Sequence, residues 1–147
     1  MTRFNDTFRG KEVYVRQAFG FFYLQPEEEA SALEAAQRAV GSGEAAFAHY
    51  VGEAEVETML GATTLAGFLE PLHYDLTRDG EGRVTNLLRR DGPAMRPSLD
   101  AEVIGAAAAY AAAATLVFAT PFGDGWEWTF QDGRLQQFSG RVGVCER

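Results

Sequence analysis

The chain has few of the residue types that build most metal and redox sites. It contains a single cysteine, Cys145, and two histidines, His49 and His73. One cysteine cannot form an intrachain disulfide, and this usage is typical of a reducing compartment. Neither a Cys-x-x-Cys pair nor a histidine pair at i, i+4 is present. We therefore expect no metal site and no cofactor.

The common nucleotide-binding and nucleophile motifs are also missing. The dinucleotide pattern needs a third glycine, which three Gly-x-Gly segments lack: 41–43, 80–82 and 123–125. There is no Gly-x-Ser-x-Gly elbow. We interpret the glycine segments as turns. No catalytic residue is assigned, and the absence of these motifs favours a protein without enzymatic activity over an enzyme.

No segment of the sequence has the character of a signal peptide or a spanning helix. The first residues lack an apolar stretch. Residues 103–122 carry no charge and are long enough to span a bilayer. However, their first half is rich in alanine, which inserts weakly, and residues 115–121 have the pattern of a β-strand followed by proline. We expect a soluble cytoplasmic protein without a membrane segment.

The net charge of −8 is concentrated in one part of the chain. Residues 27–57 contain eight glutamates and one base, Arg38, and so account for −7 of it. A negative field repels phosphate backbones, so we expect no nucleic-acid partner. Two interpretations of this acidic surface stay open: a solvated helical face, or a docking face for a basic partner.

Alternation and capping signals predict the elements of the first half. Residues 11–24 alternate apolar and other side chains, which predicts a strand, although Phe19, Phe22 and Tyr23 also have helical spacing. Pro26 followed by three glutamates predicts the start of a helix that ends at 41–43. A second helix, with Phe47, and a third over about 55–70 are expected to follow.

The second half predicts hairpins around one helix. Strands are expected at 72–77 and 83–88, and then a helix capped by Ser98 or Asp100. Three final strands would be joined by two-residue turns at 124–125 and 132–133, both Asp-Gly. Together these elements predict one α+β domain over residues 1–147. Its mostly antiparallel sheet would have about five or six strands, with three to four helices packed on one face.

If both turns form, the register of the last strands places two groups of side chains on opposite faces. The expected core face holds Val117, Ala119, Trp126, Trp128, Phe130, Leu135 and Gln137. On the other face Phe118, Phe122, Glu127 and Phe138 lie among polar residues. Exposed aromatic residues with polar neighbours often mark a contact surface. We expect that surface to be covered by a second subunit or by the segment that carries Phe19, Phe21 and Phe22.

Five residues are candidates for ligand binding. Trp126 and Trp128 would line a small-molecule pocket with Gln137 as its polar group, or else simply fill the core. His73 and Asp75 lie two apart on a predicted strand and would share a face. They are the best acid–base pair in the chain, with the exposed polar face of a hairpin as the alternative.

Two families share features with this sequence. The order helix, two strands, helix, three strands over residues 44–141 resembles roadblock/LC7 modules, as do segment 90–92 and the alanine-rich helix after 99–102. The strand and the two helices ahead of that unit are additional to the family's order. Residues 128–135 are similar to the last hairpin of NTF2/SnoaL-like domains, from whose usual order the hairpin at 72–88 departs.

These observations predict a non-catalytic protein-interaction or regulatory module that acts as a homodimer. Three features support this prediction: the lack of catalytic motifs, the aromatic residues predicted at the surface, and the concentrated charge. The alternative is a small-molecule-binding protein or enzyme with an aromatic-lined pocket, of the NTF2/SnoaL-like kind or similar.

Overall fold

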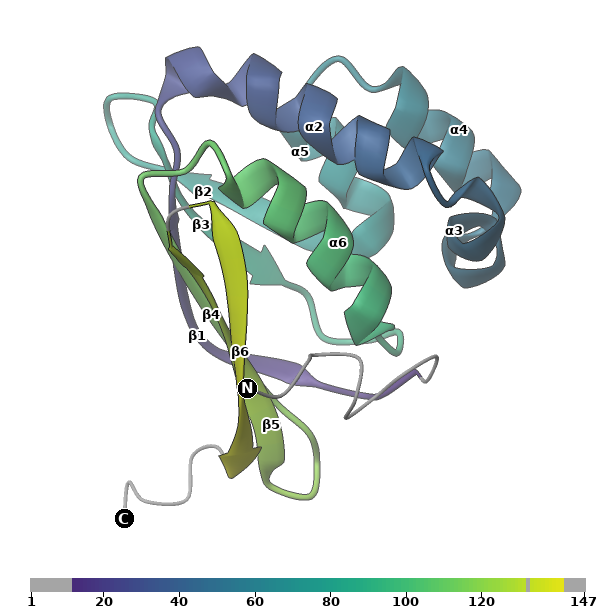
Figure 1. Ribbon diagram of the computed structural model, residues 1–147, viewed down its shortest axis with the longest axis vertical. Coiled ribbons are helices and arrows are strands. Elements are labelled where there is room, and N and C mark those ends of the chain that lie inside the picture. The colour runs from purple at the N-terminus through teal and green to yellow at the C-terminus, as the bar shows by residue number, and fades with distance from the viewer. Residues whose placement is uncertain (1–11, 132, 142–147) are drawn as a thin grey trace.

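The computed structural model describes residues 12–131 and 133–141 of the chain, which form an α+β fold (Figure 1). This part contains five α-helices and six strands, and every strand pair is antiparallel, which confirms the predicted class. The elements run in the order β1 (Arg16–Tyr23), a 3₁₀ turn (Pro26–Glu28), α2 (Glu29–Gly41), α3 (Glu44–Val51), α4 (Glu53–Gly61), α5 (Leu65–Leu69), a 3₁₀ turn (Glu70–Leu72), β2 (Tyr74–Arg78), β3 (Val84–Arg89), α6 (Pro97–Ala108), β4 (Ala113–Ala119), β5 (Asp124–Gln131) and β6 (Arg134–Arg141).

The strands form two sheets where the sequence predicts one. Four strands pair in the order β1-β4-β5-β6, and β2 and β3 pair separately. Strand β3 still lies beside β1, but the backbones there share only the bridge between Leu24 and Val84. Farther along, the Gln17 amide fills the gap: its Nε2 donates to the Leu87 carbonyl and its Oε1 accepts from the Arg89 N–H, both at 2.9 Å. A side chain therefore replaces the ladder that would have joined all six strands.

Strand β1 confirms the strand interpretation of residues 11–24 over the helical one. It continues through Gly20, and its register against β4 shifts between Gln17 and Phe19. This β-bulge turns Gln17 to the same side as its partner Phe118, which explains why Gln17 breaks the apolar alternation. Gly20 sits where a Cβ atom would come within 2.5 Å of the Gln17 Nε2, so its missing side chain makes room for that amide.

The helices pack on one side of the four-stranded sheet, with α2 and α6 in contact with each other (Figure 1). The start at Pro26 and the end near Gly41 confirm the first predicted helix. The predicted helix over 55–70 is split into α4 and α5. The break comes at Thr64, which caps α5 by accepting a 3.0 Å hydrogen bond from the Gly67 N–H.

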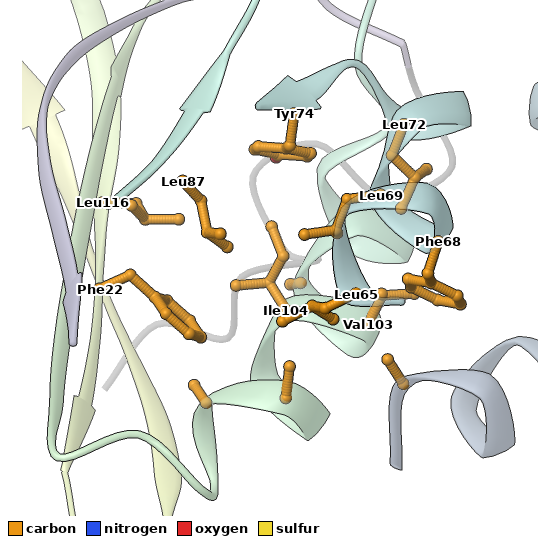
Figure 2. Close-up of a cluster of buried hydrophobic side chains, with 14 of the residues drawn as sticks. Phe22, Leu65, Phe68, Leu69, Leu72, Tyr74, Leu87, Val103, Ile104 and Leu116 are labelled. Atoms are coloured by element: carbon orange, nitrogen blue, oxygen red, sulfur yellow. The ribbon is translucent and has the colours of Figure 1, made fainter. Parts of the chain in front are cut away.

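One hydrophobic core joins the helices to both sheets. Figure 2 shows Phe22 and Leu116 of the large sheet and Leu87 of the hairpin facing Ile104 of α6. Tyr74 of β2 and the labelled side chains of α5, Leu65, Phe68 and Leu69, continue this cluster. Because so many elements share it, the core fixes where the outer face of the large sheet and the hairpin stand relative to the helices.

The register of β4 against β5 differs from the prediction. Asp124-Gly125 is not the turn but the start of β5; the turn spans 120–123, where the Gly123 N–H donates to the Thr120 carbonyl. Phe118 therefore pairs with Trp126 and is fully buried, and Val117 lies on the opposite face. A shift of odd length exchanges the two faces of a strand. The prediction of an exposed Phe118 was wrong for this reason.

The last hairpin has the predicted register. Gln131 pairs with Arg134, which leaves two residues for the turn, and Gly133 has a positive φ of 74°. Trp126, Trp128, Phe130 and Gln137 are all buried, as predicted. The charge-free stretch 103–122 contains the end of α6 and all of β4. None of the helices in the described ranges has both the length and the apolar character needed to cross a membrane.

Candidate functional site

The outer face of the four-stranded sheet is the side that points away from the helices (Figure 1). Paired residues on neighbouring strands share a face, so the register defines this surface row by row. The first row runs across β1, β4, β5 and β6 through Phe19, Val117, Glu127 and Phe138. The second row runs through Phe21, Thr115, Thr129 and Gln136. The outer face thus has an aromatic edge on β1 and a polar middle.

Three aromatic rings line the β1 side of this face. The centroids of Phe19 and Phe21 are 6.0 Å apart in an edge-to-face arrangement, and Phe21 stacks on Tyr23 at 5.3 Å. Phe19 is 58% exposed and Tyr23 48%, and across the sheet Phe138 is 56% exposed. Burial of such rings against a partner lowers the free energy, because it removes apolar surface from water.

The predicted interface residues occupy different environments. Glu127 and Phe138 lie opposite each other on β5 and β6, and Phe122 in the β4–β5 turn is 83% exposed. Phe118 belongs to the core, as described above. The segment with Phe19, Phe21 and Phe22 does not cover this surface: it extends the sheet as an added strand and contributes its own aromatic side chains to the outer face.

The tryptophan group predicted to bind a ligand lies inside the core. Trp126 and Trp128 are buried with ring centroids 6.0 Å apart, and both contact the Phe118 ring. The Trp128 indole N–H donates to the Gln137 Oε1 at 3.0 Å, and the Gln137 Nε2 donates to Ser139. Gln137 is therefore explained as the hydrogen-bond partner of a buried indole.

A cavity lies elsewhere, beside α3, α4 and the segment that precedes β2. It has a volume of about 530 Å³. Its lining comes from helices α3 and α4, residues 70–73 and the loop after β3: Tyr50, Val51, Glu55, Thr58, Glu70, Pro71, His73, Arg90, Pro93 and Ala94. We call it the His73 cavity.

His73 and Asp75 do not share a strand face. His73 precedes β2 and has a left-handed φ of 71°, the only positive φ among the described non-glycine residues. Asp75 pairs with Arg90, which also binds the Glu70 carboxylate at 3.0 Å. Burial and the nearby charges of Arg89 and Arg90 lower the pKa of His73, so its ring is neutral at pH 7.

The Tyr50 hydroxyl joins this cavity to a buried carboxyl group, for which the sequence predicted only the role of a helix cap. Asp100 of α6 is fully buried and accepts 2.7 Å hydrogen bonds from the Tyr50 and Tyr74 hydroxyls. Burial raises its pKa to about 6, opposed by Arg89 and by the two hydroxyls. The signal in the sequence was its position three and four residues before Val103 and Ile104, on the apolar side of the helix.

Arg89 supplies positive charge to the same region. Its side chain is buried, and Nη2 donates to the Pro93 carbonyl at 3.0 Å. Within the described chain its Nε has no hydrogen-bond partner. Burial raises the pKa of both Tyr50 and Tyr74, and the Asp100 charge adds to this, so both phenols stay protonated and act as donors.

The parts of the chain that the structure describes hold no group of three or more His, Cys, Asp or Glu side chains arranged for a metal ion. No protein-family model matches the chain. Comparisons with curated proteins and with solved structures likewise return no match.

Proposed function

We propose that this protein is a non-catalytic interaction module that forms a homodimer through the outer face of its four-stranded sheet. The observation that carries the proposal is the aromatic edge of that face. Phe19, Phe21 and Tyr23 line one edge of the face, and Phe138 lies on the opposite edge. Val117 and Glu127 lie between Phe19 and Phe138, and no described helix covers this surface.

The composition of this face suits a protein interface. Aromatic side chains are enriched in interface cores, and the polar rim of an interface stays solvated. Here the rings of β1 flank Thr115 and Thr129, whose hydroxyl oxygens lie 3.3 Å apart. The Thr129 hydroxyl also donates to the Glu127 carboxylate, so the polar groups in the middle of the face have partners before any second molecule arrives.

The distribution of charge favours a second copy of this chain as the occupant. The acidic part, residues 27–57, forms α2, α3 and the start of α4 on the far side from the outer face. Two copies that approach with those helices facing each other repel. The four strands of the large sheet instead contain three arginines and two acids, so their charge is close to balanced.

The outer face can also match its own copy. A two-fold dimer brings the same patch together from both subunits, so the patch must complement itself. Glu127 lies in the middle of the face, and Arg134 lies on β6 opposite Gln131. Arg16 lies at the start of β1. A face with charges of both signs and an aromatic edge meets this requirement.

The size of the face sets the expected strength. Four strands of seven to eight residues cover roughly 25 by 19 Å, or about 500 Å² in projection. A standard interface buries about 800 Å² on each partner. We therefore expect a dimer that dissociates on dilution rather than an obligate one.

The test is the solution mass, measured by light scattering over a concentration series. We expect the mass to rise from 16.1 kDa toward twice that value. Phe19→Asp and Phe138→Asp should each hold the protein at the monomer mass. A monomer at every concentration would refute the proposal.

A matched control distinguishes dimerisation through the outer face from non-specific association through any exposed apolar residue. Leu60 on α4 is also an exposed large apolar residue, but it lies on the acidic helical side. Leu60→Asp should leave the dimer unchanged. If Leu60→Asp dissociates the dimer while Phe138→Asp does not, the interface is the helical side and the proposal is wrong.

A further inference from the structure

Two strand edges of the described fold have no neighbouring strand, those of β2 and β6. The other edge of the small sheet, β3, lies beside β1, and the Gln17 amide closes the gap between them. A strand edge presents unpaired N–H and C=O groups, which proteins usually block with charge, proline, a bulge or a short strand. The edges of β2 and β6 differ in how far they are blocked.

The edge of β2 has several of these features. The strand has only five residues, and its register with β3 shifts between Thr77 and Arg78. The side chains of Asp75 and Arg78 are charged, and both form ion pairs with residues of other segments. Charge and irregularity of this kind discourage pairing with a further strand.

The edge of β6 has none of them. The strand spans the eight residues Arg134–Arg141 and keeps an unbroken register with β5 over all of them. Between its terminal arginines it contains no charged residue and no proline. Within the described ranges, no residue outside β5 forms a backbone hydrogen bond with it. Strand β6 is therefore a regular, open edge of the large sheet (Figure 1).

The turn before β6 determines which of its backbone groups point outward. Gln131 and Arg134 flank a two-residue turn, and the pair that flanks such a turn is joined by backbone hydrogen bonds. Hydrogen-bonded and non-hydrogen-bonded pairs alternate along an antiparallel ladder. Every second residue from Arg134 onward therefore bonds to β5. The N–H and C=O groups of the residues between them, Leu135, Gln137 and Ser139, point to the open edge.

A strand added at this edge would meet apolar surface on its helix side. Helix α6 contacts both β5 and β6, and a Cβ atom at Gly105 would lie 3.6 Å from the Cε1 atom of Phe130. Phe130 pairs with Leu135, which is half-buried against the core. A side chain opposite Leu135 on the added strand would lie next to this group, so an apolar side chain is favoured there.

The acidic helices argue against β6 of a second copy as the added strand. Antiparallel pairing of two β6 strands would extend one sheet into the other and keep the helices of both copies on the same side. Residues 27–57 of each copy carry a charge of −7 on that side, so the two helical layers would repel each other. An uncharged peptide avoids this repulsion.

We propose that the β6 edge binds an extended peptide segment of another protein, antiparallel to β6, uncharged and with apolar side chains at alternate positions. The backbone groups of Leu135, Gln137 and Ser139 supply the hydrogen bonds, and the surface beside Leu135 selects the apolar positions. The peptide lies in the plane of the sheet, whereas the proposed dimer uses the outer face. The two interactions are therefore independent.

The test uses a synthetic probe, the acetylated heptapeptide amide Thr-Val-Thr-Val-Thr-Val-Thr. In an NMR titration we expect saturable binding, with slower hydrogen exchange at the amides of Leu135, Gln137 and Ser139. The amides of Gln136 and Phe138, which already bond to β5, should change less. Absence of binding, or binding without this protection, would overturn the proposal.

Two N-methylated forms of the probe test the backbone ladder with every side chain unchanged. In an antiparallel pair the residues directly opposite Leu135 and Gln137 are hydrogen-bonded, and the apolar preference places valines there. N-methylation of the valines should weaken binding about tenfold or more, the effect of losing about one hydrogen bond. N-methylation of the threonines, whose N–H groups face away, should leave binding unchanged. Any other pattern would contradict the proposal.

Two substitutions at Ser139 form a matched pair on the protein. Ser139→Pro removes an outward N–H group and leaves the ladder with β5 intact. Ser139→Ala keeps that N–H group and removes only the hydroxyl, which accepts from the Gln137 Nε2. Probe binding should fall about tenfold in Ser139→Pro and persist in Ser139→Ala. Equal losses would assign the effect to the hydroxyl and refute binding at the edge.

Measurements of mass keep this proposal separate from the dimer. Ser139→Pro should leave the mass of the wild-type protein unchanged; a fall to the monomer mass would show that β6 pairs with a second copy and would refute the peptide site. Phe19 lies on β1, at the opposite edge of the sheet, so Phe19→Asp should bind the probe as the wild type does. A monomeric wild type that binds the probe would refute the dimer alone.

Discussion

The Tyr50 hydroxyl donates a 2.7 Å hydrogen bond to the Oδ1 atom of Asp100, so a residue of the cavity wall is joined directly to a buried carboxyl group. Tyr74 of β2 binds the other oxygen of that carboxyl group at the same distance. The pair of hydroxyls ties α3 and the hairpin to α6. Because Asp100 is fully buried, its protonation has consequences for stability that exposed acids do not share.

Asp100 should make the protein less stable as pH rises from about 4 to about 6. Its pKa is about 6 in the folded protein and 3.8 in the unfolded chain. Between these values the folded state holds a proton that the unfolded state has released. The stabilisation present below pH 4 is therefore lost as pH passes 6, by about 3 kcal/mol at most. Urea unfolding at steps of half a pH unit measures this loss in the free energy of unfolding.

Asp100→Asn should remove this part of the pH dependence. The wild-type free energy of unfolding minus that of the variant should fall over the same interval and level off above about pH 6.5. Tyr50, Tyr74 and Arg89 face this carboxyl group in both proteins, and the phenols do not titrate there. A difference that is constant from pH 4 to 7 would mean that Asp100 has an ordinary pKa.

Gln17→Met should loosen the contact between β1 and β3. The substitution keeps the length of the side chain but leaves the Leu87 carbonyl and the Arg89 N–H without their partner. Each buried polar group left without a partner costs about 1–3 kcal/mol. We expect a loss of about 2–4 kcal/mol in the free energy of unfolding, together with faster hydrogen exchange at the Arg89 amide.

The Leu87 amide provides an internal control for that measurement, because it donates to the Asn86 side chain and not to Gln17. Its exchange should change less than that of Arg89. Protection of the Arg89 amide that survives Gln17→Met would show that the side-chain bridge is not what holds the two sheets together.

Gly20→Ala should destabilise the fold through the same bridge. The new Cβ atom would lie 2.5 Å from the Gln17 Nε2 and 2.9 Å from the Leu116 Cδ2, so one of the two must move. Overpacking of this kind typically costs about 1–3 kcal/mol. Gly140 of β6 has open space around its position, so Gly140→Ala is the control and should be near neutral. Thermal unfolding of both variants is the measurement: the midpoint of Gly20→Ala should be lower than that of Gly140→Ala. Equal midpoints would contradict the prediction.

Phe118→Ala and Val117→Ala test the register of β4. Phe118 packs on Trp126 and Trp128 in the core, whereas Val117 lies on the outer face opposite Glu127. Removal of the buried ring should cost about 3–5 kcal/mol, and removal of the half-buried valine about 1 kcal/mol or less. The reverse order would restore the register expected from an Asp124-Gly125 turn.

The sequence predicted correctly those features that depend only on neighbouring residues. The proline and glutamates at 26–29 start a helix because they suit a helix N-terminus. The last hairpin turns between Gln131 and Arg134, where the sequence predicts an Asp-Gly turn, and Gly133 has a positive φ. The Asp-Gly at 124–125 has the same turn preference but begins a strand, because the nearby Gly123 has the positive φ, of 94°. Whether the turn forms at 124–125 or at 120–123 depends on which register of β4 against β5 buries Phe118.

The features of the candidate sites depended on long-range contacts, which the sequence did not reveal. Asp100 resembles an ordinary residue of a first helical turn until Tyr50 and Tyr74, 50 and 26 residues away in the chain, are seen to bind it. His73 was expected on a strand because its neighbours alternate, yet a 3₁₀ turn continues into it. The outer face was predicted on the right strands β5 and β6, but its aromatic edge comes from β1.

The pairing of β1 with β4 also constrains how the protein is made. These strands lie at residues 16–23 and 113–119, so about 90 residues must leave the ribosome before β1 meets its partner. Synthesis at about 5–20 residues per second makes that interval several seconds or longer. During it the aromatic strand has no sheet to join, and pairing between such distant segments is slow to form. Nascent chains of this protein should therefore depend on chaperones for β1 until the C-terminal hairpins are complete.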